Sequence, residues 1–209
     1  MMITQTMLES LRADIANKLS PYRMAHTLGV EEMVTRLAEL YCPENGALLR
    51  AAALLHDVTK ELDNAAQTAI FDAYGVKLRP DEVASPKVWH GMTAALIIPE
   101  RYPDLADPEL ISAVRYHTTG RADMTLCEAL LYLADYIEEG RRFDDCVMLR
   151  NKFFAADPAS MSPAVRRRHL RDILLLSLEM TISELTALGG TVCLDSLAAR
   201  EDLKNRSEF

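Results

Sequence analysis

The stretch Ala51-Ala52-Ala53-Leu54-Leu55-His56-Asp57 decides the fold of this chain. A run that is apolar on all sides predicts a helix at the centre of a core, and we expect this helix over residues 47–59. An unpaired ionised carboxylate is costly in such a place. A metal ion bound by the imidazole of His56 and the carboxylate of Asp57 removes the conflict. The stretch therefore predicts a helical core with a metal site inside it.

Helical periodicity continues on both sides. From Tyr22 to Tyr41 apolar residues recur at steps of three and four, with charged residues between them, as in an amphipathic helix. Further helices are expected at 65–74, closed by Gly75; at 89–98, stopped by Pro99; at 107–117, begun by Asp107-Pro108; at 125–138, capped by Thr125 and Glu128; and at 162–188, ended by Gly189-Gly190, with a short one after Asp195.

The pattern as a whole predicts an all-α protein. No segment alternates with the period of two that marks a half-buried strand. We expect one helical bundle domain over residues 1–209, with its motifs at about 20–143 and C-terminal helices at 160–205. No linker or internal repeat argues for a second domain.

Composition and charge disfavour several classes of protein. The chain has 209 residues and a net charge of −8, which disfavours a general nucleic-acid binder because such proteins need a basic face. Four cysteines lie far apart without metal-binding spacing, as expected in a reducing cytosol. The N-terminus does not resemble a secretory signal, and no apolar run approaches the ~20 residues that span a bilayer. We expect a cytoplasmic protein that does not bind membranes.

The remaining chemistry-bearing residues extend the metal site. Four of the five histidines lie inside or at the ends of predicted helices, namely His26, His56, His90 and His117. Asp135 lies in the apolar run 130–137, where burying an unpaired carboxylate would cost as much free energy as burying that of Asp57. The order His26, His56-Asp57, Asp135 on three helices matches the H…HD…D pattern of the HD phosphohydrolase superfamily.

The segments around these residues resemble one family within it, the YqeK family of bacterial symmetrical bis(5′-nucleosyl)-tetraphosphatases. The resemblance covers roughly residues 22–143 in order, and weakly the C-terminal helix through Thr181. It is carried by Tyr22-Arg23-Met24-Ala25-His26-Thr27, Leu55-His56-Asp57-Val58-Thr59-Lys60, Val88-Trp89-His90-Gly91, Arg115-Tyr116-His117-Thr118-Thr119-Gly120-Arg121 and Tyr132-Leu133-Ala134-Asp135-Tyr136-Ile137-Glu138.

The resemblance implies that the substrate is a dinucleoside tetraphosphate, chiefly diadenosine tetraphosphate, cut in the middle to two ADP, and that the metal is iron, as one or two ions. The implied metal ligands are His26, His56, Asp57 and Asp135. The implied catalytic residues are Asp57, Lys60, His90 and His117. The implied substrate contacts are Arg23, His26, Asp57, Lys60, His90, His117, Thr118, Asp135 and Arg141. The last match departs from the family, because Glu139-Gly140-Arg141-Arg142 stands where Pro-Asn before a single Arg is expected.

The residues suit this chemistry on physical grounds. A phosphoanhydride resists attack because its anionic oxygens repel a nucleophile, so an enzyme needs an activated water and positive charge against the phosphoryl oxygens. Lys60, three residues after Asp57, would share its helix face and meet a phosphate as a point charge. Arg121 and Arg23 are further candidates for contact with the substrate.

Two alternatives stay open. The chain could be an HD phosphohydrolase for another nucleotide, because the HD residues build the metal centre and not the base pocket. It could also be a helical nucleotide-binding module without catalysis, although such a module would be expected to lose ligands that are all present here. A homodimer is compatible with the apolar C-terminal helix, and the run Arg166-Arg167-Arg168 is expected to be a solvated face.

Overall fold

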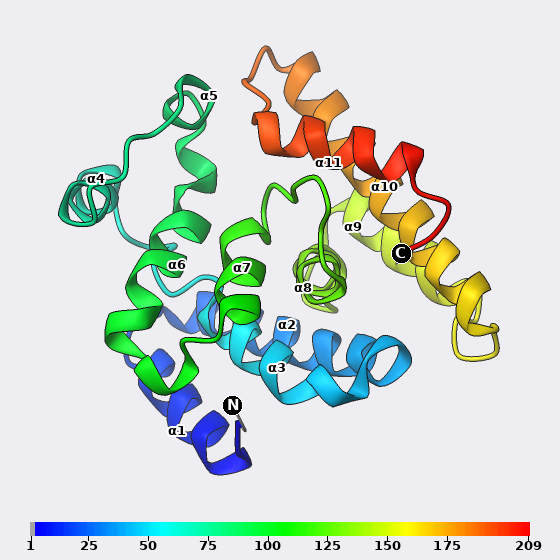
Figure 1. Ribbon diagram of the computed structural model, residues 1–209, viewed down its shortest axis with the longest axis horizontal. Coiled ribbons are helices and arrows are strands. Elements are labelled where there is room, and N and C mark those ends of the chain that lie inside the picture. Colours follow the sequence, from blue (N-terminus) through cyan, green and yellow to red (C-terminus); the bar gives the residue numbers. More distant parts are fainter. Residues whose placement is uncertain (1–2) are drawn as a thin grey trace.

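The computed structural model describes residues 3–209, and this part of the chain is built from helices without a β-strand (Figure 1). The all-α prediction is therefore confirmed. The α-helices are α1 (Gln5–Ala16), α2 (Pro21–Tyr41), α3 (Gly46–Leu55), α4 (Asn64–Ala73), α5 (Pro80–Val83), α6 (Trp89–Arg101), α7 (Pro108–Tyr116), α8 (Leu126–Ile137), α9 (Asp144–Ala155), α10 (Pro163–Ala187) and α11 (Leu194–Asn205).

Helix α8 occupies the middle of the molecule, where Figure 1 shows it end-on, and it packs against α2, α3, α7 and α9. Each residue from Cys127 to Ala134 is buried, which explains why this helix is apolar on all sides. A capping box fixes its start, because Thr125 accepts a hydrogen bond from the backbone of Glu128 and Glu128 accepts one from the backbone of Thr125. Asp135 is thus carried into the interior by a rigid, central element.

Helix α3 packs closely on α2. Its three successive alanines, Ala51 to Ala53, are fully buried, because α1, α2, α7 and α8 all pack against this helix. Together with Leu54 and Leu55 they confirm the predicted central helix. This packing places His56 and Asp57, at the end of α3, next to His26 in the second turn of α2.

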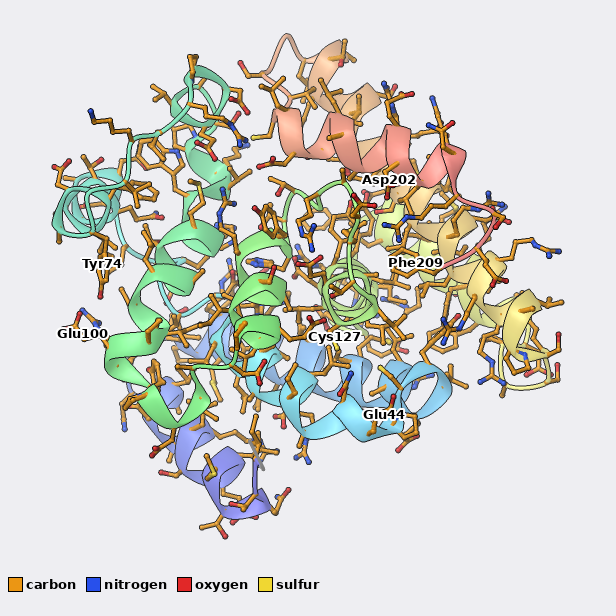
Figure 2. All side chains as sticks on the ribbon, in the orientation of Figure 1. Glu44, Tyr74, Glu100, Cys127, Asp202 and Phe209 are labelled. Atoms are coloured by element: carbon orange, nitrogen blue, oxygen red, sulfur yellow. The ribbon has the colours of Figure 1, made fainter. Side chains whose placement is uncertain are left out.

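One apolar cluster runs from Leu8 on α1 to Leu203 on α11 and includes residues of α2, α3, α6, α7, α8, α9 and α10. The side chains that fill the space between the helices are drawn in Figure 2, where Cys127 lies inside and Tyr74 and Glu100 lie at the rim. At that rim the hydroxyl of Tyr74 donates to Glu100 and connects the end of α4 to α6. No helix within residues 3–209 is both long and apolar enough to span a membrane.

The predicted helix ends were wrong at two places. Helix α3 ends at Leu55 rather than near Thr59, and residues 56–61 continue as successive turns, with Lys60 N donating to the carbonyl of Asp57. Helix α6 continues through Pro99 to Arg101. Proline removes one backbone donor near the helix end, and the last turn is still closed by a hydrogen bond from Tyr102 N to Ile98 O.

Three helices, α1, α9 and the four-residue α5, were not predicted. Helix α1 is held by a buried carboxylate, because Glu31 on α2 accepts hydrogen bonds from Arg12 on α1 and from Arg50 on α3. Helix α9 is amphipathic only weakly, and its buried face consists of Cys146, Leu149, Arg150 and Phe153.

The expectation of a solvated Arg166–Arg168 run is wrong for its first residue. The guanidinium of Arg166 donates to the carbonyls of Leu40 and Met161. The bond to Leu40 connects the start of α10 to the end of α2.

Candidate metal centre

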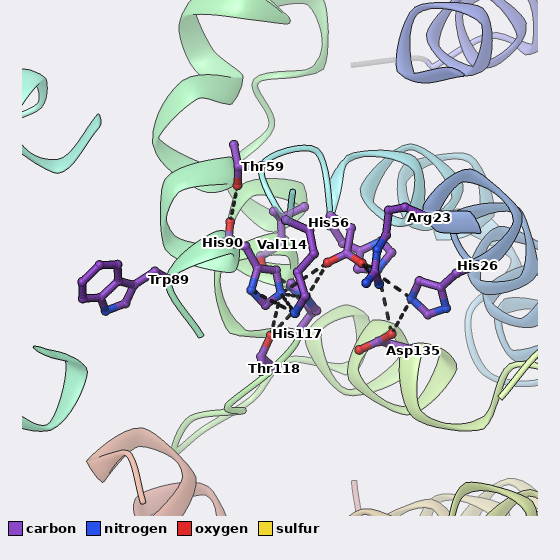
Figure 3. Close-up of polar contacts among 12 residues, drawn as sticks. Arg23, His26, His56, Thr59, Trp89, His90, Val114, His117, Thr118 and Asp135 are labelled. Carbon is purple, nitrogen blue, oxygen red and sulfur yellow. Dashed lines mark hydrogen bonds and ion pairs between the residues drawn. The ribbon is translucent and has the colours of Figure 1, made fainter. Parts of the chain in front are cut away.

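Four imidazoles and two carboxylates meet between α2, α3, α6, α7 and α8 (Figure 3). Ligand-competent atoms within each of three groups lie within 4.8 Å of one another. The groups are His26, His56 and Asp57; His56, His117 and Asp135; and Asp57, His90 and His117. Residues far apart in the sequence are therefore brought together in space.

Asp57 is at the centre of the cluster and is only 2% exposed. Its Oδ2 lies 3.4 Å from Nε2 of His56 and 3.7 Å from Nε2 of His26. Its Oδ1 lies 3.3 Å from Nε2 of His90 and 3.9 Å from Nε2 of His117. The two oxygens thus face two different pairs of imidazoles.

Backbone carbonyls orient two of the rings. Nδ1 of His56 lies 2.6 Å from the carbonyl of Ala53, and Nδ1 of His117 lies 2.7 Å from that of Val114. A carbonyl only accepts hydrogen bonds, so each Nδ1 carries the proton and each Nε2 presents a lone pair to the cluster. Both histidines directly follow a helix, where the free carbonyls of the last turn are available.

His26 is oriented by carboxylates. Its Nδ1 lies 3.1 Å from Oε1 of Glu138, a residue just past α8, and its Nε2 lies 3.0 Å from Oδ1 of Asp135. A side chain at Gly29, one turn along α2, would overlap Oε2 of Glu138. The glycine thus leaves the space in which Glu138 reaches His26.

The donor set fits a metal ion. Nε2 of His26 and Nε2 of His56 are buried and have no hydrogen-bond partner of acceptable geometry among residues 3–209. Buried polar atoms are rarely left without a partner, and such atoms need an explanation. Imidazole nitrogens next to the carboxylates of Asp57 and Asp135 are the ligand types that zinc, iron and similar divalent ions accept in proteins.

Protonation follows the same geometry. Burial lowers the pKa of His26, but contacts with Asp135 and Glu138 outweigh it and raise the pKa to about 9. Burial lowers the pKa of His117 to about 4. Burial would raise the pKa of Asp57, but the neighbouring imidazole of His56 holds it well below its ordinary value. The carboxylate is therefore ionised and ready to bind a cation.

Positive charge surrounds the cluster. Arg23 Nη1 lies 2.7 Å from Oδ2 of Asp57, and Arg141 Nη2 lies 2.6 Å from Oδ1 of Asp135. Nζ of Lys60 lies 3.3 Å from both ring nitrogens of His90, and burial lowers its pKa. Arg141 thus reaches the cluster even though its segment departs from the family pattern.

Two further residues predicted to contact the substrate, Thr118 and Arg121, differ in their distance from the cluster. The hydroxyl of Thr118 is 3.1 Å from Nε2 of His117, at the edge of the cluster. Arg121 points elsewhere: its Nε donates to Glu128, 2.9 Å away, and its guanidinium lies over the ring of Tyr116. Its contact with substrate stays a prediction without support from this geometry.

A family comparison agrees with this arrangement, since the model of the HD domain matches residues 23–140, from Arg23 to just past Glu138. The chain belongs to the HD-domain family. HD domains bind divalent metals, and all six residues of the cluster lie within the matched range.

Individual relatives place the chain in the YqeK-type branch of HD domains. It is 32% identical over 160 residues to a Staphylococcus aureus protein named "Bis(5'-nucleosyl)-tetraphosphatase, symmetrical", covering 76% of this chain and 79% of that one. It is 31% identical over 137 residues to a Bacillus subtilis protein of the same name, covering 65% and 71%.

A solved structure extends the likeness beyond the matched range. The "predicted HD superfamily hydrolase involved in NAD metabolism" from Clostridium acetobutylicum superposes with a TM-score of 0.80 at 29% identity, over 95% of this chain and 97% of that one. The similarity therefore includes the C-terminal helices outside the HD match.

The sequence interpretation of this HD domain missed one residue that touches the cluster. Glu138 ends the quoted motif but was assigned no role. The sequence carried a signal, because an acid directly after the apolar run 130–137 is costly if it is buried without a partner. In the structure Glu138 is only 3% exposed.

Proposed function

We propose that this HD domain hydrolyses dinucleoside tetraphosphates, chiefly diadenosine tetraphosphate, at the central phosphoanhydride to give two ADP. The observation that carries the proposal is the buried cluster of four imidazoles and two carboxylates with cationic side chains around it. The names of the relatives supply the substrate class.

The ligands proposed for the metal are His26, His56, Asp57 and Asp135, and the ion proposed is ferrous iron. A second ion is supported by Oδ1 of Asp57, which faces His90 and His117. Since Nδ1 of His117 donates to the carbonyl of Val114, its Nε2 offers a lone pair and suits an ion better than a phosphate oxygen.

When bound, the metal lowers the pKa of a coordinated water and polarises a phosphoryl oxygen. Asp57 accepts a hydrogen bond from the attacking water and orients it. Lys60, Arg23 and Arg141 stabilise the negative charge that builds up on the phosphoryl oxygens. The leaving group is ADP, a weak base, so neutralising its charge contributes more than a dedicated proton donor.

Space for a nucleotide lies beside the cluster. A pocket of about 620 Å³ extends from His117, Thr118 and Asp135 toward Thr181 and Glu184 on α10. We refer to it as the α8–α10 pocket. Its volume is in the range of small-molecule sites, and its hydroxyl and carboxylate groups can bind the hydroxyls of a ribose.

The unit that acts is proposed to be one domain over residues 1–209, which the single apolar cluster from Leu8 to Leu203 supports. A cytoplasmic location and a homodimer remain predictions. The partner that the site favours is a small nucleotide.

Metal removal tests the proposal. Protein stripped by a chelator should lose hydrolysis of diadenosine tetraphosphate and regain it with ferrous iron under anaerobic conditions. Asp57→Asn should stay inactive after reloading, whereas the matched surface variant Asp72→Asn should recover, since Asp72 is exposed on α4. Activity that survives chelation, or an active Asp57→Asn protein, would contradict a metal-dependent mechanism.

A further inference from the structure

A second pocket borders His26, whereas the α8–α10 pocket borders its contact Asp135. It has a volume of about 660 Å³, and its lining includes Tyr22, Arg23, His26, Arg142 and Phe143. We call it the α2 pocket, because Tyr22 and Arg23 lie in the first turn of that helix.

The two pockets meet at the metal-binding cluster. Arg141 and Phe143 line both of them, while His26 lines only the α2 pocket and Asp135 only the α8–α10 pocket. Since Nε2 of His26 lies 3.0 Å from Oδ1 of Asp135, the cluster stands where the two spaces join. A molecule that extends to both sides of the cluster would enter one pocket with each end.

We propose that the α2 pocket binds the second nucleotide half of a dinucleoside tetraphosphate, while the α8–α10 pocket holds the first. This inference rests on the proposed function. Central cleavage requires that the bond between the two inner phosphates lie at the cluster, so two phosphates and one nucleoside must extend to each side. Two pockets of similar volume on the two sides match a substrate with two identical halves.

Charge supports a phosphate in the α2 pocket. Three arginines line it, Arg23, Arg141 and Arg142, whereas the α8–α10 pocket has Arg141 alone. Nη1 of Arg23 is bonded to Asp57, but the side chain is 19% exposed and lines the pocket, so the rest of the guanidinium can meet a phosphate there. Guanidinium groups bind phosphate oxygens with well-directed hydrogen bonds.

Two exposed rings support a base. Tyr22 is 78% and Phe143 is 64% exposed, although most large apolar side chains of this protein are covered. Bases stack on such rings, and each stacked base is worth enough to change binding about tenfold or more. Pro21 and the Ser20 cap fix the first turn of α2, so Tyr22 is presented by a rigid segment.

The first test counts bound ADP, the product of central cleavage. Titration calorimetry of the metal-loaded protein with ADP should give two sites per chain. The double variant Tyr22→Ala/Arg142→Ala should retain one. A single site in the wild type, or two sites in the double variant, would overturn the proposal. The number of ADP sites does not depend on turnover, so this test gives an answer even if the protein cleaves another nucleotide.

The second test uses the kinetics of diadenosine tetraphosphate. Tyr22→Ala should raise KM about tenfold while kcat stays within about a factor of two, because the ring binds the distant end of the substrate. Tyr22→Phe, which keeps the ring, should match the wild type. An unchanged KM in Tyr22→Ala would contradict the assignment, whereas a wild type that makes no ADP would instead reject the proposed function.

Discussion

Oε1 of Glu138 lies 3.1 Å from Nδ1 of His26, and this contact determines which ring nitrogen faces the cluster. When a metal ion takes the place of the Nε2 proton, the carboxylate that holds the Nδ1 proton keeps the Nε2 lone pair directed toward Asp135 and Asp57. Histidines that bind metals commonly make this second contact, which fixes the ring and strengthens the ligand. Glu138 is therefore a positioning residue, and it connects the end of α8 to the second turn of α2.

Glu138→Gln should weaken metal binding about tenfold, because the amide keeps the size of the side chain but is a weaker acceptor for the proton of Nδ1. Metal affinity can be measured by competition with a chromogenic chelator. The neighbouring Glu139, with a side chain 61% exposed, provides the matched control, and Glu139→Gln should bind metal like the wild type. Equal affinity in both variants would show that the contact does not position His26.

Gly29→Ala should also weaken metal binding, in this case through packing. Alanine favours a helix interior over glycine by about 1 kcal/mol, so propensity alone predicts a more stable protein. The added Cβ would, however, overlap Oε2 of Glu138 and displace that side chain from His26. We expect a loss of metal affinity of at least a few-fold.

Gly46→Ala is the control for this change, because a Cβ there would have its nearest neighbour, Ala38 Cβ, at 4.0 Å. It should keep full metal affinity. A Gly29→Ala protein that binds metal as tightly as Gly46→Ala would disprove the close packing of Glu138 against α2.

Glu31→Gln should destabilise the protein by about 1–3 kcal/mol. The carboxylate is buried and accepts from Arg12 Nε at 2.7 Å and from Arg50 Nε at 3.0 Å, so the neutral amide leaves two guanidinium groups poorly paired. Denaturant unfolding of the metal-loaded protein measures the change in the free energy of unfolding. Glu32→Gln, on the exposed face of α2, should stay within about 0.5 kcal/mol of the wild type.

Local sequence rules predicted the central helices well. The buried alanines of α3 and the Thr125–Glu128 capping box are short-range signals that packing reinforces. The same rules failed where the tertiary structure decides. Helix α1 depends on the partners that Arg12 finds on other helices, and α9 has too weak an apolar face to be recognised from periodicity.

For the site, too, local sequence signals predicted some residues, and the tertiary structure decided the rest. Costly carboxylates in apolar runs predicted Asp57 and Asp135 from the sequence, and the two lie in one cluster. The turns after Leu55 were not predicted, and they place Lys60 against His90 rather than on a continued helix face. The α2 pocket is lined by the start of α2 and by the segment before α9. No pattern within either segment predicts that the two lie side by side.

Product analysis tests the central claim most directly. Protein loaded anaerobically with ferrous iron is incubated with diadenosine tetraphosphate, and the nucleotides are separated by chromatography beside a His56→Ala control. We predict ADP as the sole product and none from the control, because the cut falls between the two inner phosphates at a site that needs His56. AMP together with ATP would contradict central cleavage, and no turnover by a metal-loaded wild type would contradict the assigned substrate.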